Sequence, residues 1–243
     1  GYTIAYPAWP GISGATKGVL GWSTRANVQT DIDQAAAKLA PINAKLEAAE
    51  LTAISDDAEL SGYAASAGSA VFLTWCAQCH GSGAGGAVGY PNLLDNDWLW
   101  GGDIEAIYAT VKHGIRNEED DDARYSEMPA FGDDYLEDAQ IDSVVNYVMS
   151  LSGEPMDASL VAAGGEVFVE ECASCHMEDG TGDREQGAPN LSDAIWLYGG
   201  DYDAIKETVT NSRFGVMPNW STRLSDAQIR AVSVYIHQLG GGE

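Results

Sequence analysis

Apolar residues recur three to four positions apart in several segments, and this spacing predicts an all-α protein. In two segments a Gly-Gly-Asp comes directly before the helical pattern, where its Asp is placed to cap the helix. Gly-rich residues 81–89 and residues 177–188 have no periodicity and are expected to be loops. The expected helices span residues 28–51 (interrupted or kinked near Pro41), 62–75, 104–113, 138–151, 160–171, 202–210 and 225–239.

A set of short motifs occurs twice in the same order, about 90–100 residues apart, which indicates two homologous domains. The first copy contains Cys76-Ala-Gln-Cys79-His80, Pro91-Asn92-Leu93, Trp98-Leu-Trp-Gly101-Gly102-Asp103, Met128-Pro129 and Asp138-Ala139-Gln140-Ile141. The second contains Cys172-Ala-Ser-Cys175-His176, Pro189-Asn190-Leu191, Trp196-Leu-Tyr-Gly199-Gly200-Asp201, Met217-Pro218 and Asp226-Ala227-Gln228-Ile229. We therefore expect an N-terminal segment at 1–60, a first domain at 61–152 and a second at 153–243, each closed by its own last helix.

Two residues between paired thiols, followed at once by His, predict covalent attachment of haem c. Cys76 and Cys79 in the first copy, and Cys172 and Cys175 in the second, would bond the porphyrin vinyl groups. His80 and His176 would then ligate the two irons. A zinc site built from all four cysteines would leave both histidines and both Met-Pro pairs unexplained. Covalent haem also places the mature protein outside the cytoplasm, on the outer face of a bacterial inner membrane or its organellar equivalent.

The sixth iron ligand is expected to be the Met of a Met-Pro pair, because a thioether favours ferrous iron and Pro keeps the loop rigid. Met128 and Met217 occupy matching places in the repeat. His113 is the alternative ligand in the first domain. The sequence thus predicts two tandem class I cytochrome c domains, each with one haem.

Other side chains near these motifs have roles that the sequence leaves open. Trp98, Trp100, Trp196 and Tyr198 would line the haem edges or fill the core, and Arg116, Arg124 and Arg213 would pair with haem propionates. The acidic run at 117–122 has no match in the second copy. It is either a solvated loop or a docking patch for a basic electron donor.

The chain carries 12 basic and 37 acidic residues among its 243, for a formal charge of −25. Such a charge argues against nucleic acid as a partner and favours either a basic partner or simply high solubility. Residues 1–10 carry three aromatic residues, two prolines and no charged side chain. Tyr and Trp favour the membrane interface, so this stretch is interpreted either as the end of a membrane helix whose body lies upstream or as an aromatic N-terminal arm.

The whole chain resembles the dihaem subunit, subunit III, of cbb3-type cytochrome c oxidases. The stretches that carry the resemblance are Tyr6-Pro-Ala-Trp-Pro10, Lys17-Gly18-Val19-Leu20-Gly21-Trp22-Ser23, Cys76-Ala-Gln-Cys79-His80-Gly81, Pro91-Asn92-Leu93, His113-Gly114-Ile115-Arg116 and Met128-Pro129-Ala130-Phe131-Gly132. The resemblance favours the lost membrane anchor. It implies His80 with Met128 for the first haem and His176 with Met217 for the second.

The resemblance also implies a function: the chain would accept electrons from a donor cytochrome c. It would pass them through a monohaem subunit to the catalytic subunit that reduces oxygen, on the periplasmic side of the bacterial inner membrane. It would not itself be an enzyme. The alternatives are a free-standing dihaem shuttle, against which the stretch at 6–10 argues, and a dihaem peroxidase, against which a Met-Pro in both domains argues.

Overall fold

A computed structural model describes residues 1–6, 10–11, 14–15, 18–133 and 135–243. Pro7, Ala8, Trp9 and Lys17, which belong to the N-terminal motifs, lie outside the described residues. The chain forms two separate compact units, Gly1–Ala48 and Ala49–Glu243, which we describe one at a time.

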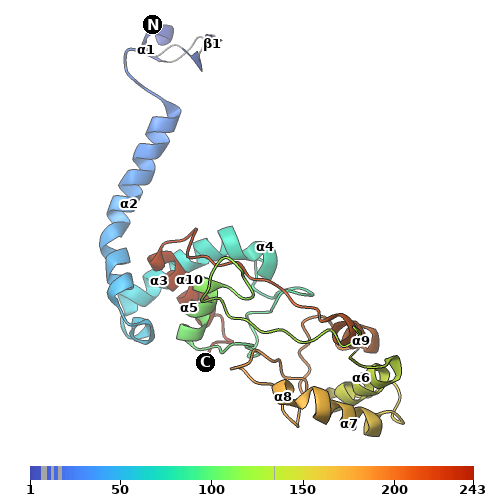
Figure 1. Ribbon diagram of the computed structural model, residues 1–243. Helices are drawn as coiled ribbons and strands as arrows, with labels where there is room; N and C mark the ends of the chain where they lie inside the picture. Colours follow the sequence, from blue (N-terminus) through green and yellow to red (C-terminus); the bar gives the residue numbers. More distant parts are fainter. Residues whose placement is uncertain (7–9, 12–13, 16–17, 134) are drawn as a thin grey trace. The chain divides into compact units, whose positions relative to one another are not determined.

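The first unit contains one long helix and a short hairpin (Figure 1). Helix α1 (Tyr2–Ala5) precedes strands β1 (Pro10–Gly11) and β2 (Gly14–Ala15), which pair antiparallel, and α2 spans Thr24–Ala48. Helix α2 confirms the helix expected near 28–51 but is assigned without a break, with Pro41 inside it. Among the described residues, no helix is both long enough and apolar enough to cross a membrane.

The second unit is helical, as expected. All six of its helices predicted from the sequence are present. Their bounds and those of the shorter turns are η1 Leu51–Asp56, α3 Ala58–Val71, η2 Phe72–Cys76 (one π-helical turn), α4 Ala77–His80, α5 Ile104–His113, α6 Asp138–Ser152, α7 Val161–Glu171, α8 Ala173–His176, α9 Tyr202–Asn211 and α10 Asp226–His237. Asp103 and Asp201 cap α5 and α9 as predicted, accepting hydrogen bonds from Ala106 (2.8 Å) and Ala204 (3.0 Å).

The closing helices of the two repeats are exchanged. Helix α10, from the second repeat, packs on α3 and α5 of the first, whereas α6, from the first repeat, packs on α7 and α9 of the second (Figure 1). We call these groups the Cys76 bundle (α3, η2, α4, α5 and α10) and the Cys172 bundle (α6 to α9). Each has its own apolar core, around Phe72 and Val232 in one and around Phe168 and Val144 in the other. The expectation that each repeat closes its own domain was therefore wrong.

Equivalent glycines make the same close crossing in both bundles. A Cβ on Gly68 of α3 would collide with the backbone oxygen of Ala231 in α10. A Cβ on Gly164 of α7 would collide with the backbone oxygen of Ser143 in α6. Gly68 and Gly164 each lie eight residues before the first Cys of their motif. The two interfaces therefore match at their closest point, as an exchange of equivalent helices between the repeats requires.

Two features favour the exchanged arrangement. Only residues 153–160 separate α6 from α7, and so short a connection places consecutive helices side by side. Polar contacts also differ: Asp142 of α6 binds Lys206 and Tyr202 of α9. The residue of α10 that corresponds to Asp142 is Arg230, which would meet Lys206 if each repeat closed on itself.

Candidate haem-binding sites

Each Cys-Xaa-Xaa-Cys-His motif occupies the end of a helical segment. In the first copy η2 ends at Cys76 and α4 carries Cys79 and His80; in the second, α8 carries Cys175 and His176. The π-helical turn precedes only the first motif. One helical turn therefore presents two thiols and an imidazole together, which is the arrangement predicted from the sequence.

Both motif histidines are held in the same way. The Nδ1 atom of His80 lies 3.0 Å from the carbonyl oxygen of Pro91, and Nδ1 of His176 lies 3.0 Å from that of Pro189. With Nδ1–H donating to a carbonyl, the lone pair of Nε2 is left for a metal. Burial lowers the pKa of both histidines, and the hydrogen bond opposes it without reversing it. The donor set thus fits a metal ligand in both copies.

The thiols of Cys76 and Cys172 have raised pKa values, which makes them unreactive as nucleophiles. Burial, with the neighbouring Cys79, raises the pKa of Cys76 to about 11. Burial, with Glu171 and Cys175, raises the pKa of Cys172 to about 12. A redox-active dithiol needs a lowered thiol pKa, so these pairs do not suit dithiol exchange. They fit permanent attachment to a haem.

The loops after the motifs form tight structures that fix the two proline carbonyls. Gly86 and Gly182 have positive φ angles of 67° and 76°. A Cβ on either residue would collide with the carbonyl oxygen of the residue that precedes Pro91 or Pro189. Their N–H groups donate to the carbonyls of His80 (2.8 Å) and His176 (3.0 Å). The Gly-rich sequence therefore lets each loop fold back against its own histidine.

Met217 lies in the Cys76 bundle. Its side chain packs against the core cluster that contains Cys76. Its backbone exchanges two hydrogen bonds with Ile115, both 3.0 Å, and Trp220 donates to the carbonyl of Val111 at the end of α5 (3.2 Å). A second-repeat methionine is therefore built into the bundle that holds His80.

Met128 occupies the corresponding place in the Cys172 bundle. Phe131, three residues beyond it, donates to the carbonyl of Val209 at the end of α9 (3.1 Å), as Trp220 does to Val111. The hydroxyl of Ser212 donates to the carbonyl of Met128. The structure therefore places Met217 in the bundle that contains His80, and the backbone of Met128 beside the end of α9, in the bundle that contains His176. The pairing that the resemblance implied, His80 with Met128 and His176 with Met217, follows sequence order and differs from this arrangement.

Trp98 and Trp196 pack against the two apolar cores, whereas the aromatic residues directly before the Gly-Gly turns lie where the bundles meet. Trp100 packs on Gly187 of the second repeat, and the corresponding Tyr198 packs on Gly89 of the first, 3.3 Å from a Cβ placed there. The buried Nε1–H of Trp100 has no hydrogen-bond partner among the described residues. A buried donor calls for an acceptor, and a haem propionate supplies one, so this side chain also fits a haem site.

The three arginines expected near propionates donate to main-chain oxygens. Arg124 donates to Trp100 and Ala106, and Arg213 donates to Ala204. Arg124 stacks over the Trp100 ring and Arg213 over the Tyr198 ring. Arg116 differs from both because its donors reach two separate segments, as described below. Their pairing with propionates stays a prediction.

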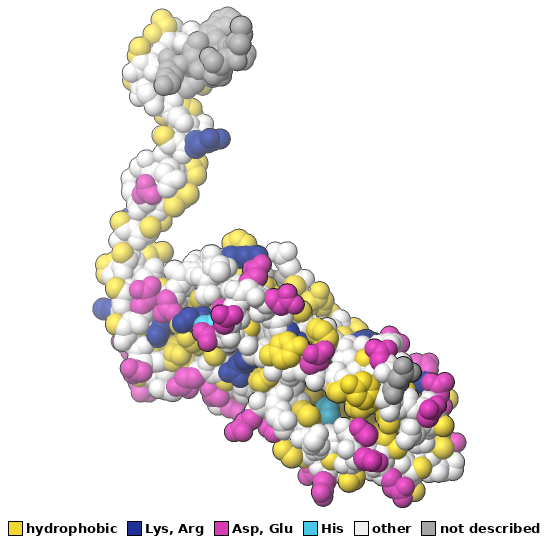
Figure 2. Space-filling model, in the orientation of Figure 1, with side chains coloured by type: hydrophobic (Ala, Val, Ile, Leu, Met, Phe, Trp, Pro, Cys, Tyr) yellow, Lys and Arg dark blue, Asp and Glu magenta, His cyan; other side chains and the backbone are white. Residues whose placement is uncertain are grey.

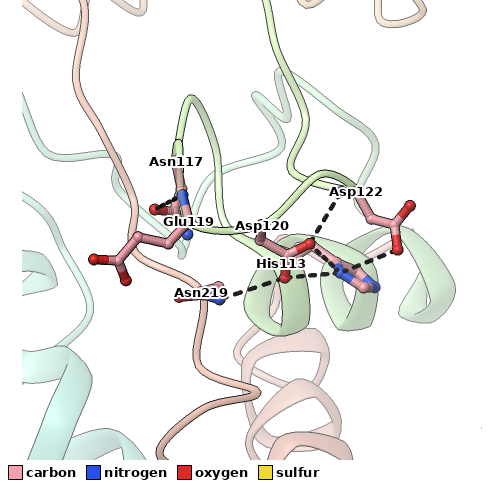
Figure 3. A network of polar contacts seen from close by, with 6 residues as sticks. All are labelled: His113, Asn117, Glu119, Asp120, Asp122 and Asn219. Atoms are coloured by element: carbon pink, nitrogen blue, oxygen red, sulfur yellow. Dashed lines mark hydrogen bonds and ion pairs between the residues drawn. The ribbon is translucent and has the colours of Figure 1, made fainter.

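His113, the alternative ligand for the first haem, is engaged by the acidic run (Figure 3). Its Nδ1 atom lies 3.1 Å from both carboxylate oxygens of Asp120 and 4.0 Å from Asp122. Asn219, two residues beyond Met217, donates to Asp120 at 3.4 Å. Burial raises the pKa of Asp120, but hydrogen bonds from Asp122, His113 and Asn219 outweigh it, so the pKa falls below its usual value.

Sequence reasoning did not identify the residues that hold the ligands. The carbonyls of Pro91 and Pro189 orient the histidines, and Ile115 and Ser212 hold the methionine segments. The repeated Pro-Asn-Leu was a visible signal for the first pair. A backbone carbonyl has no sequence signature of its own. Ile115 and Ser212 are different residue types, so no sequence signal could have identified them as the residues that hold the methionine segments.

Two haem-attachment motifs, two metal-ready histidines and two methionines in matched all-α bundles define a dihaem c-type cytochrome. Comparisons agree: residues 65–152 match the cytochrome c family, and residues 159–236 match the family of cytochrome c oxidase, cbb3-type, subunit III. The whole chain is 62% identical to the cbb3-type cytochrome c oxidase subunit CcoP of Cereibacter sphaeroides and 55% identical to that of Rhodobacter capsulatus. It covers 84% and 85% of these relatives.

The subunit FixP of Sinorhizobium medicae is 48% identical over the whole chain, which covers 84% of that relative. The chain belongs to this CcoP/FixP family, subunit III of cbb3-type cytochrome c oxidases. Its cofactors are two covalently bound haem c groups, and its function is electron transfer within the oxidase.

Proposed function

We propose that this chain takes single electrons from a donor cytochrome c with a basic docking face. It passes them to the monohaem subunit, and from there they reach the catalytic subunit. Oxygen is reduced in the catalytic subunit and not on this chain. We place the chain on the periplasmic side of the bacterial inner membrane, because haem c is attached outside the cytoplasm.

The observation that carries this proposal is that each bundle contains one motif histidine and one methionine of a Met-Pro pair. His80 and Met217 belong to the Cys76 bundle, and His176 and Met128 belong to the Cys172 bundle. These four residues would hold the two irons, and a His and a Met at each iron would leave no coordination position open to peroxide or oxygen, which favours a carrier over a peroxidase. The bound haems supply reversible one-electron chemistry, and His/Met ligation suits them to electron transfer.

The protein fixes the positions of the residues proposed as iron ligands. The Pro91 and Pro189 carbonyls fix the imidazoles, while Pro129 and Pro218 restrict the backbone beside each methionine. A ligand set that changes little between oxidation states lets an electron arrive and leave with little rearrangement of the protein.

Charge supports a basic donor. Asp and Glu side chains are spread over the visible face of residues 49–243, as Figure 2 shows, and the formal charge of the chain is −25. The acidic run at 117–122 adds a local concentration of charge beside Asn219 and the Met217 segment. A negative field of this kind speeds encounters with a basic protein and is weakened by salt.

Low-temperature EPR and near-infrared MCD of the oxidised holoprotein test the proposal, together with stopped-flow mixing against reduced basic cytochrome c and against hydrogen peroxide. We expect two low-spin haems with thioether ligation, reduced rapidly by the cytochrome and inert towards peroxide. A high-spin haem that turns over peroxide would overturn the proposal in favour of a peroxidase. A bis-His haem would bring back His113 as a ligand.

A further inference from the structure

The two chain segments that carry the methionines cross between the bundles. Arg124 still contacts Trp100 of its own repeat, yet Met128, four residues later, lies in the Cys172 bundle. Arg213 likewise contacts Ala204 of its own repeat, while Met217 lies in the Cys76 bundle. Residues 125–127 and 214–216 are therefore the two crossover segments.

One side chain, Arg116, binds both crossover segments. Its Nε donates to the carbonyl of Ser126 (2.6 Å) and one terminal nitrogen donates to the Ser126 hydroxyl (2.7 Å). The other terminal nitrogen donates to the carbonyl of Gly215 (3.1 Å). Ser126 and Gly215 hold the same position in the two repeats, each two residues before its methionine. The guanidinium also lies over the ring of Phe214, 5.6 Å from its centre.

The backbone around Arg116 makes the same connection. Ile115 pairs with Met217 on one side, and the N–H of Arg116 donates to the carbonyl of Arg124 on the other (2.7 Å). Residues 114–123 lie between α5 and Arg124, whereas only Ser212 lies between α9 and Arg213. The second repeat therefore has no equivalent of Arg116, and one residue serves both crossings.

We propose that Arg116 is a positioning residue for both axial methionines, so that the ligation of the two haems depends on one shared contact. This inference rests on the proposed function, because it presupposes Met128 and Met217 as iron ligands. A planar guanidinium is suited to the role, since its fork donates in several fixed directions at once. A lysine ammonium, a compact charge on a flexible stem, does not hold two backbone segments at a set separation.

The test is Arg116→Lys in the dihaem holoprotein, followed by redox titration, near-infrared MCD and carbon monoxide binding to the reduced form. Loosened thioether bonds stabilise ferrous iron less, so both midpoint potentials should fall. Carbon monoxide competes with the thioether, so its binding to both haems should rise by about tenfold, the effect of losing one charged hydrogen bond.

Two further variants distinguish the loss of the shared Arg116 contact from a general disturbance of the fold. Arg124→Lys, which alters contacts within one repeat only, should shift only the haem ligated by Met128. Ser126→Ala, which removes one acceptor from one crossover, should shift the same haem by less. If Arg116→Lys disturbs the fold, Arg116→Ala with added methylguanidinium should restore both potentials together.

A shift of one haem alone in Arg116→Lys, or of neither, would overturn the inference. Restoration of one potential without the other by methylguanidinium would overturn it too. These outcomes are distinct from failure of the proposed function, which would be seen in the unmodified protein as the absence of two thioether-ligated haems.

Discussion

The Cys76 and Cys172 bundles repeat one arrangement, and they agree closely at the main helix crossing, at the motif histidine and three residues after each methionine. Both use a glycine at the main helix crossing, Gly68 or Gly164, and both fix the motif histidine through a proline carbonyl. Both receive their closing helix and their methionine from the other repeat. These features leave little freedom, because an added Cβ would collide with the neighbouring backbone and a rotated imidazole would lose its hydrogen bond.

The bundles differ where side chains meet solvent or each other. One crossover segment reads Tyr125-Ser126-Glu127 and the other Phe214-Gly215-Val216. Asp97 in the first repeat corresponds to Ile195 in the second, and only the first repeat has residues 114–123. The backbone framework expected to hold the haems is therefore duplicated, whereas the charged and surface side chains differ between the two bundles.

The largest effect is expected at the crossing glycines. Gly68→Ala and Gly164→Ala should each destabilise the protein by about 3 kcal/mol, because the new methyl group overpacks against a neighbouring backbone. Denaturant unfolding of the holoprotein measures this. Gly62→Ala, on the same helix as Gly68 but facing open space, is the control and should stabilise by about 0.5–1 kcal/mol. Equal effects of Gly62→Ala and Gly68→Ala would contradict the tight crossing.

A second prediction concerns the acidic run, which only the Cys76 bundle has. Changing Glu118, Glu119, Asp121 and Asp122 to their amides should slow reduction by a basic cytochrome c about tenfold at low salt, since the steering field is lost. Stopped-flow rates at several ionic strengths would show a flatter salt dependence. The control neutralises four carboxylates near the other motif: Glu166, Glu170, Glu171 and Glu178. If both sets slow the reaction equally, net charge matters and the run is a solvated loop.

A third prediction uses Asp97, which has an apolar counterpart. Burial, with repulsion from Asp193 and Asp95, raises the pKa of Asp97 to about 6. Because the pKa of this carboxyl is raised in the folded protein, the free energy of unfolding decreases as pH rises from about 4 to about 6. It stays at the lower value above that pH. Asp97→Asn should therefore stabilise the protein by about 1 kcal/mol at pH 7 and not at pH 4. Urea unfolding at both pH values checks this; a gain independent of pH would contradict it.

The smallest prediction concerns the ion pair that distinguishes the bundles. Hydrogen bonds from Lys206 and Tyr202 lower the pKa of Asp142, so its contribution is present above about pH 4 and lost below it. Asp142→Ala and Lys206→Ala should show a coupling of about 0.5 kcal/mol at neutral pH, because the pair is partly exposed. A double-mutant cycle measures the coupling. Absence of coupling would mean that the pair does not help to select the exchanged arrangement.

Much of this architecture could be predicted from the sequence. Helical periodicity located the helices, the Gly-Gly-Asp turns marked the starts of α5 and α9, and the repeated motifs predict which residues bind the haems. These signals are local, and local patterns survive any arrangement of the helices.

The exchange could not be predicted in this way. Helices α6 and α10 present almost the same apolar face, so hydrophobic pattern does not say which repeat each one closes. Which repeat each helix closes depends on the short connection at 153–160 and on the opposite charges of Asp142 and Arg230. The effect of these charges can be judged only when the residues that they contact are known. The role of Arg116 was missed for the same reason: its contacts lie ten and 99 residues away in sequence.

The exchange of methionines between repeats is tested most directly by NMR of the reduced dihaem holoprotein with isotope-labelled methionine. The methyl resonance of Met128 is assigned by its loss in Met128→Leu. We predict nuclear Overhauser contacts from this methyl group to the haem whose thioether bridges include Cys172 and Cys175. Contacts to the haem bonded to Cys76 and Cys79 would contradict the exchanged ligation and restore the pairing by sequence order.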